Sequence, residues 1–283
     1  MTRPHELQLL DTATAAARAG GAVLVGLFGD PSLDVRRKGR NDFVTGADHA
    51  SEAAVVAEIR RSFPRHPILA EEGGALDGSS EHEWVIDPLD GTTNFLQGLP
   101  VFCVSVACRR GGELLAGAVF EPLSGRMFAA ARGRGATLDG APIRVSGQSG
   151  LGGAFLATGY PFRAHGALDR YLGAFREIFL QARAIRRCGA AALDLAHTAA
   201  GIYDGFFEFR LSPWDLAAGV LLIREAGGIV TDLDGGQGFL ESGNVVAGGP
   251  GVHPDLRSAV ARHADEAALA RLTPELEEPV AAG

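Results

Sequence analysis

The stretch WVIDPLDGTTNF, residues 84–95, joins an apolar run to two acidic residues, a proline and a glycine turn. The run up to Ile86 predicts a strand, and Asp87 should lie at its carboxyl end, where α/β folds place their ligands. Pro88 fixes φ and removes one N–H donor. We expect the following turn to send Asp90 to the same side as Asp87. The stretch therefore predicts a polar site at the end of a buried strand.

The chemistry of this stretch suits a metal and a phosphate. Two carboxylates and the carbonyl oxygen of Leu89 match a hard divalent cation such as Mg2+, which takes oxygen ligands at about 2.0–2.1 Å. Gly91 and Thr92 should offer N–H groups at a helix start, and such groups bind phosphate oxygens. The alternative is a turn in which an aspartate side chain only caps the helix. Asp87 and Asp90 by themselves leave both interpretations open.

Other carboxylates stand at the ends of predicted elements. Glu71 and Glu72 end the strand in HPILAEEGG and could face the same cleft. Asp215, in SPWDLAAG, opens a helix, where it could also be an acid stabilised by the helix dipole. Asp48, in NDFVTGADHASE, could be only the N-cap of the second helix. A structural role, such as helix capping, would explain each of these residues taken singly. Together, the carboxylates favour a metal site.

The chain predicts a mixed α/β (α+β) fold. Before about residue 150, strands separated by Gly-containing turns indicate an antiparallel sheet behind two helices. After it, strands alternate with helices, which indicates two stacked sheets with helices outside them. We divide the chain into an N-terminal α+β half, residues 1–147, and a C-terminal α/β half, residues 148–283. The helices are expected at residues 6–28, 51–63, 167–180, 190–200, 214–226 and from residue 253.

Composition limits the classes of function. The 283 residues are 46% hydrophobic and carry a net charge of −8, with a pI near 5.5. This charge does not favour direct binding of nucleic acid or of an anionic membrane. No apolar run reaches the 18 or so residues of a membrane helix, and the charged N-terminus lacks a signal-peptide core. Because three cysteines make no disulfide framework, we expect a cytoplasmic protein.

Together the motifs resemble the inositol monophosphatase family of Mg2+-dependent, lithium-sensitive phosphatases, in particular its bacterial members. WVIDPLDGTTNF matches the pattern WxxDPxDGTxNF, and PWDLAAGVLLIREAGG matches WDxAAGxxxxxEAGG. NDFVTGAD, ILAEEG and AALDLAHTAAGIYDGFFE stand in the same order, so the resemblance covers residues 6–262. It implies a layered α/β/α/β/α sandwich of the inositol monophosphatase and fructose-1,6-bisphosphatase type. It also implies a homodimer that hydrolyses myo-inositol monophosphate.

The same resemblance implies two to three Mg2+ ions. Glu71, Asp87 and the Leu89 carbonyl would bind the first ion. Asp87, Asp90 and Asp215 would bind the second, and a third, weaker ion would depend on Glu71. This arrangement corresponds to the two-metal logic of phosphate ester hydrolysis.

Catalysis and substrate binding are implied in the same way. Thr92, partnered by Asp48, would orient and help deprotonate the water that attacks phosphorus in line. Glu71, a ligand of the first ion, is implied as the third catalytic residue. Relatives often carry Ser or Thr at the position of Ala190, so a possible hydroxyl contact to the ring is lost here. Thr93 fits relatives that act on inositol phosphates. The substrate-binding residues implied are Asp90, Gly91, Thr92, Gly189, Ala190, Ala191, Glu208 and Asp215.

Two alternatives remain open. The same chemistry could act on fructose 1,6-bisphosphate, histidinol phosphate or phosphoadenosine phosphate. The chain could instead serve mainly as a binding partner of the transcription machinery. Among the cations, the run Arg36–Arg40 is expected in a loop, as solvated surface or as a lid. Arg186 and Arg187 are expected in a surface or dimer ion pair rather than at the phosphate.

Overall fold

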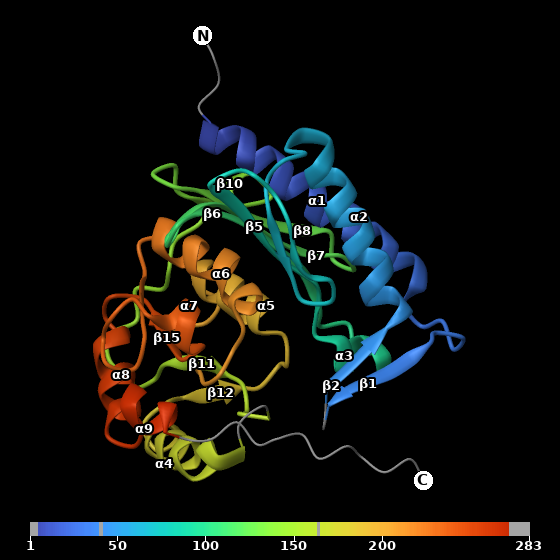
Figure 1. The fold of residues 1–283 in the computed structure, drawn as a ribbon. Helices are drawn as coiled ribbons and strands as arrows, with labels where there is room; N and C mark the ends of the chain where they lie inside the picture. The colour runs from blue at the N-terminus through green and yellow to red at the C-terminus, as the bar shows by residue number, and fades with distance from the viewer. Residues whose placement is uncertain (1–4, 40–41, 163–164, 272–283) are drawn as a thin grey trace.

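Helical and sheet layers alternate through the molecule in the order helix, sheet, helix, sheet, helix (Figure 1). The computed structural model describes residues 5–39, 42–162 and 165–271. The layered α/β/α/β/α architecture expected from the sequence is confirmed.

The N-terminal half forms the first helical layer and the larger sheet. Helices α1 (His5–Leu27) and α2 (Gly46–Ser62) pack side by side on one face of an eight-stranded sheet of order β10-β9-β8-β7-β6-β5-β3-β4. Buried side chains of both helices, such as Leu9 and Val55, join those of the sheet in one apolar core. The strands are β3 (Ile68–Ala70), β4 (Gly74–Leu76), β5 (His82–Asp90), β6 (Cys103–Arg110), β7 (Glu113–Glu121), β8 (Arg126–Ala131), β9 (Ala136–Leu138) and β10 (Ala141–Pro142).

The central layer consists of α5 (Ala191–Ala199) and α6 (Pro213–Glu225), which lie between the two sheets in Figure 1. Every residue of α6 from Asp215 to Ile223 is buried, as a helix covered on two sides requires. The core around it takes side chains from both sheets, for example Val119 and Ala247. The N-terminus of α6 thereby reaches the end of β5.

The smaller sheet has five strands in the order β12-β11-β13-β15-β14, and α4 (Leu168–Phe179) and α8 (His253–Ala261) cover its outer face. Tyr171 and Leu256 anchor this third core. Its strands are β11 (Phe155–Thr158), β12 (Ala184–Arg186), β13 (Gly205–Glu208), β14 (Ile229–Thr231) and β15 (Val245–Gly248). The remaining elements are β1 (Val35–Gly39), β2 (Asp42–Thr45), α3 (Thr92–Leu96), a 3-10 turn (His165–Ala167), α7 (Phe239–Ser242) and α9 (Glu266–Ala270).

The expected helices are present, but the second begins at Gly46 instead of residue 51. Thr45 is its N-cap, and Asp48, at the third helical position, closes a capping box by accepting from the Thr45 N–H at 2.8 Å. The alternative in which Asp48 is the N-cap is therefore wrong. Arg36–Lys38 lie in strand β1 and not in a loop, and Arg40 lies outside the described residues.

Across the described ranges, no helix is long and apolar enough to cross a membrane. The division of the chain after residue 147 stays a prediction.

Candidate active site

Strand β5 places Asp87 and Asp90 on the same side of the sheet through a bulge. In a regular strand, residues three apart point to opposite faces. Here Asp87 pairs with Ser105 and Asp90 pairs with Cys103, so two residues of β5 oppose one residue of β6. Pro88, which cannot donate to the ladder, stands in this bulge. The expected turn is thus a bulge within a continuous strand, and it has the expected effect on the two carboxylates.

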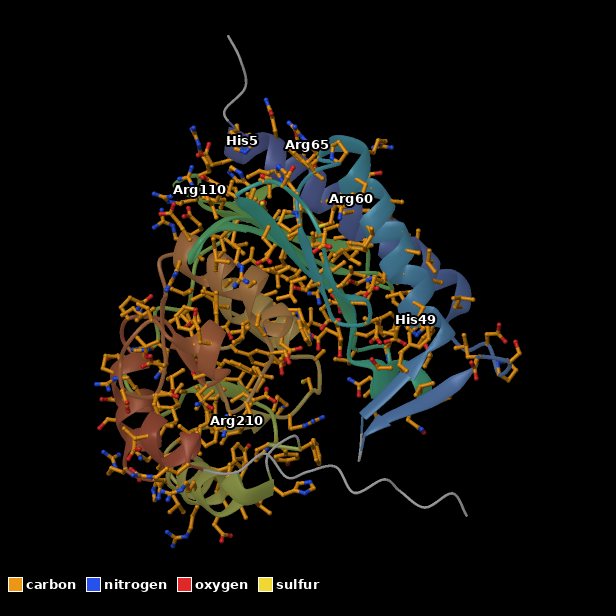
Figure 2. All side chains as sticks on the ribbon, viewed as in Figure 1. His5, His49, Arg60, Arg65, Arg110 and Arg210 are labelled. Carbon is orange, nitrogen blue, oxygen red and sulfur yellow. The ribbon has the colours of Figure 1, made fainter. Side chains whose placement is uncertain are left out.

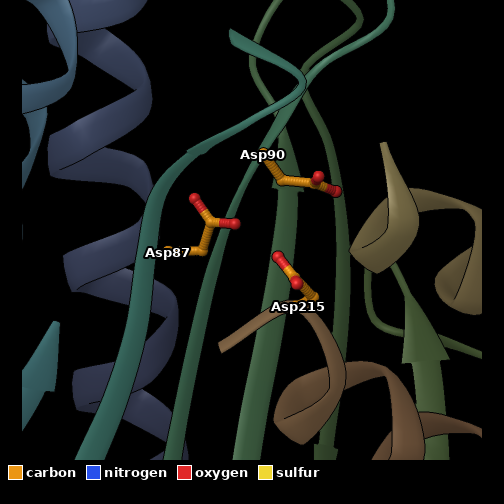
Figure 3. Close-up of side chains that lie close together, drawn as sticks. All are labelled: Asp87, Asp90 and Asp215. Atoms are coloured by element: carbon orange, nitrogen blue, oxygen red, sulfur yellow. The ribbon is translucent and has the colours of Figure 1, made fainter. Parts of the chain in front are cut away.

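Three buried aspartates form the centre of the site. Ligand oxygens of Asp87, Asp90 and Asp215 lie within 4.8 Å of one another, and Figure 3 shows the carboxylates converging from β5 and from the start of α6. Pro213 begins α6, and Asp215 at its third position accepts from the Ser212 N–H at 2.7 Å. Helix capping therefore holds the third carboxylate in place at the start of α6.

This cluster is electrostatically strained without a cation. Burial raises the pKa of Asp87 well above its ordinary value, and the charges of Glu71, Asp90 and Asp215 raise it further. Burial, with the charge of Asp215, raises the pKa of Asp90 to about 7. Oxygen-only donors are what Mg2+ prefers, and a divalent ion would offset the repulsion. The residues present therefore fit a magnesium site.

Helix α5 points its N-terminus at Asp90. The Asp90 carboxylate accepts from the backbone N–H groups of Ala191 at 3.2 Å, Ala192 at 2.8 Å and Leu193 at 3.4 Å. The N-cap position, Ala190, has no hydroxyl with which to cap the helix, so a carboxylate from the other half of the chain takes that role. The Ala191 N–H, expected to contact the substrate ring, donates to Asp90 in this structure.

Thr92 bonds to Asp48 and lies close to the Leu89 carbonyl. Its hydroxyl lies 3.0 Å from Asp48 Oδ1 and 3.1 Å from the Leu89 carbonyl oxygen, both of which are acceptors. The other Asp48 oxygen accepts from the Thr45 hydroxyl at 2.6 Å. With its proton directed at Asp48, the Thr92 oxygen can accept from a water molecule on the cavity side. The predicted Thr92–Asp48 pair is thus in hydrogen-bond contact.

Glu71 reaches the site from the β3–β4 hairpin. Its backbone N–H donates to the Ile86 carbonyl at 3.3 Å, which places it beside Asp87. Glu71 lines the same cavity as the aspartates, whereas Glu72 does not. Of the two consecutive glutamates, the first is therefore the one that lines the cavity with the three aspartates.

A cavity of about 420 Å3 brings the predicted residues together. At its far end, Glu208 from β13 packs over Gly159, where a Cβ would lie 1.9 Å from Glu208 Oε1. Burial raises the pKa of Glu208 well above its ordinary value. Every predicted site residue except Asp48 lines this cavity: Glu71, Asp87, Leu89, Asp90, Gly91, Thr92, Gly189, Ala190, Ala191, Glu208 and Asp215.

The cavity also contains residues that the sequence analysis did not assign to it. Asp194 is 2% exposed, and burial raises its pKa well above the ordinary value. An acid within the apolar run AALDLAHTAAG was the available signal. Arg187 lines the cavity and lies over the rings of Tyr160 and Phe162, at 5.3 and 5.2 Å from their centroids. Its expected place in an ion pair remains untested.

Among the labelled cations of Figure 2, only Arg210 lines this cavity. Arg60, Arg65 and Arg110 lie with His5 at the end of the molecule where α1 begins (Figure 2). The arginines at that end are thus remote from the carboxylate cluster.

Comparisons with known proteins found a family model and several relatives that match this chain. The model of the inositol monophosphatase family matches residues 5–268. The chain is 47% identical to Nus factor SuhB of Pseudomonas aeruginosa over 261 residues, which cover 90% of this chain and 96% of the relative.

Two solved structures share the fold. The extragenic suppressor protein suhB from Bartonella henselae has a TM-score of 0.88 at 38% identity, covering 91% of this chain and 100% of that one. The inositol monophosphatase from Anabaena (Nostoc) sp. PCC 7120 has a TM-score of 0.80 at 40% identity, covering 92% and 98%.

Proposed function

Because the chain belongs to the inositol monophosphatase family, we propose that it is a Mg2+-dependent phosphomonoesterase that hydrolyses myo-inositol monophosphate to inositol and phosphate. The observation that carries this proposal is the convergence of three buried aspartates on one cavity with a hydrogen-bonded Thr92–Asp48 pair. Family membership supports a phosphatase, and the proposal adds the substrate and the metal.

We propose metal-binding residues among the carboxylates and the carbonyl group that line the cavity. Glu71, Asp87 and the Leu89 carbonyl would hold one Mg2+, and Asp87, Asp90 and Asp215 a second, with a third near Glu71. When bound, such ions lower the pKa of water and neutralise charge that develops on the phosphate oxygens.

The protein's own groups would orient the reactants. Asp48 accepts from the Thr92 hydroxyl, so the Thr92 oxygen would accept a hydrogen bond from the attacking water, and as the water loses its proton to Thr92, the Thr92 proton would pass to the Asp48 carboxylate. Gly91 and Thr92 line the cavity at the start of α3, and we propose that their N–H groups bind the phosphate. Gly189, Ala190 and Glu208 would contact the ring hydroxyls at the other end. We further propose a cytoplasmic homodimer that is inhibited by lithium.

The direct test is phosphate release from myo-inositol 1-phosphate, with Mg2+ titrated from zero and lithium added at saturating Mg2+. Release that requires Mg2+ and is blocked by lithium is the expected result, and Asp215→Asn should abolish it. Fructose 1,6-bisphosphate, histidinol phosphate and phosphoadenosine phosphate form the comparison panel. Faster release from any of these would replace the inositol ester as substrate.

A second candidate function rests on the relative named Nus factor SuhB. At 47% identity, a shared role as a partner of the transcription machinery is a specific alternative. A pulldown that compares wild type with Asp215→Asn distinguishes the two, because a partner role would survive the loss of the metal site. Loss of every partner in the variant would instead tie the interaction to the catalytic centre.

A further inference from the structure

One face of helix α2 bonds to separate segments of the active site. Asp48, Ser51 and Glu52 share this face, since residues three and four apart are neighbours on a helix. Asp48 accepts from the Thr92 hydroxyl at 3.0 Å, and the Ser51 hydroxyl donates to the Pro88 carbonyl at 2.7 Å. The first contact fixes Thr92 at the start of α3, and the second fixes the part of β5 between the proposed ligands Asp87 and Asp90. Glu52 makes a third contact of this kind, with a different part of the site.

Glu52 binds the tip of the β3–β4 hairpin. Its Oε2 accepts from the backbone N–H groups of Glu72 at 3.0 Å and of Gly73 at 3.2 Å. A Cβ on Gly73 would lie 2.7 Å from Glu52 Oε1, so the carboxylate packs directly against that backbone. Hydrogen bonds from two N–H groups to one carboxylate oxygen are charge-assisted and hold the tip in a defined position.

The tip of the hairpin lies beyond its pairing with the rest of the sheet. β3 pairs with β5 as far as Ala70, and the Glu71 N–H adds one bond to the Ile86 carbonyl, whereas β4 is the edge strand. The backbone N–H groups that follow, of Glu72 and Gly73, bond to Glu52 instead. Glu71, the first residue of its tip, presents its side chain to the cavity that contains Asp87. Any shift of the tip would therefore move the Glu71 carboxylate relative to the aspartates.

We propose that Glu52 is a positioning residue for the metal site, which holds the hairpin tip so that Glu71 can bind a cation. The proposal rests on the proposed function for the assignment of a cation to Glu71. It implies that Glu52 governs the affinity of that cation. A cation held by Asp90 and Asp215 does not depend on Glu52, because those residues are fixed by β5, α5 and α6.

The test is direct metal binding to the full-length protein, with Mn2+ as the probe in electron paramagnetic resonance and calorimetric titrations. Glu52→Gln should weaken one class of Mn2+ site by about 10-fold, the scale on which partners of metal ligands act. Glu52→Ala should weaken the same class further, because glutamine keeps one acceptor oxygen. The second class of site should keep its affinity in both variants.

Glu58→Gln is the matched control. It makes the same change on the same helix, at a residue paired with Arg61 away from the cavity, and should leave both classes unchanged. Unchanged isotherms for Glu52→Ala, or equal weakening of both classes, would overturn the proposal. A purely structural role would lower the unfolding temperature without altering Mn2+ binding by the folded protein. Since no substrate is used, absence of phosphatase activity would count against the proposed function without affecting this measurement.

Discussion

The two ends of helix α6 hold acidic residues in opposite circumstances. At its C-terminal end, Glu225 accepts from the N–H groups of Gly133 at 2.8 Å, Arg134 at 3.0 Å and Gly135 at 2.8 Å. At its start, Asp215 lies within 4.8 Å of two further carboxylates.

The charge of Glu225 is thus stabilised by backbone N–H groups, and these bonds join α6 to the turn before β9. The cluster at the other end brings like charges together in a buried place, which costs stability unless a cation binds. The difference separates a carboxylate that builds the fold from carboxylates that are arranged for a ligand. Three predictions test it.

The largest effect is expected from Asp87→Asn. Loss of one of the carboxylates that we propose to bind metal should lower kcat/KM by roughly 100-fold or more, about 2.7 kcal/mol of transition-state stabilisation. The metal-free variant should unfold at a higher temperature than wild type, because the neutral side chain removes repulsion from Glu71, Asp90 and Asp215. Steady-state kinetics and thermal unfolding in chelator measure the two effects.

Asp169→Asn, an exposed acid in the first turn of α4, serves as the control and should change neither quantity. A metal-free Asp87→Asn protein that is less stable than wild type would show that the cluster is a structural network like that of Glu225.

The second prediction concerns Mg2+ and pH. The pKa of Asp90 rises from 3.8 to about 7 on folding without metal, so between these values the folded protein holds a proton that the unfolded chain has released. The contribution of Asp90 to the free energy of unfolding is therefore fully present below about pH 4 and is lost as the pH rises through about 7. At pH 8, Mg2+ at 100 times its Kd should restore about 2.7 kcal/mol, or roughly 5–10 °C in Tm.

Thermal unfolding with and without Mg2+ at pH 5 and pH 8 measures this effect. The gain should be larger at pH 8, because protonated carboxyls compete with the ion at low pH. An equal gain at both pH values would contradict the assignment of the ion to the aspartates.

The smallest effect is expected from Glu225→Gln. Glutamine keeps one acceptor oxygen but places an amide N–H group against backbone donors, which should cost about 1 kcal/mol, or roughly 2–4 °C in Tm. The kcat of the folded protein and the Mg2+ concentration that it needs should stay within about 2-fold of wild type. The cluster of three aspartates is at the other end of α6. If the variant needed more Mg2+ for activity without losing stability, Glu225 would also serve the metal site, and the two ends of α6 would not differ in role.

Local patterns predicted much of this molecule. The apolar run before Asp87, the Pro-Trp-Asp start of α6 and the alternation of strands and helices are short-range features, and the structure follows them. Thr45 as the cap of α2 was missed because Asp48, three residues later, is an equally good capping residue by type. The bulge in β5 was taken for a turn because Pro and Gly mark both.

Contacts between distant segments were not predictable in this way. Glu52 has an ordinary helical sequence around it, and its partners Glu72 and Gly73 become neighbours only when α2 packs beside the sheet. Arg187 enters the cavity because Tyr160 and Phe162 provide aromatic faces for its guanidinium. Neither of these two sets of contacts produces a periodic pattern or a motif in the sequence.

The origin of the three aspartates has a consequence for synthesis of the chain. Asp87 and Asp90 are translated with the larger sheet, whereas Asp215 and the N-terminus of α5 follow with the second half. A nascent chain that has folded its first sheet therefore holds Glu71, Asp87 and Asp90 but still lacks Asp215. The site that we propose for the second cation, which needs Asp215, would therefore be completed only when both sheets enclose α6.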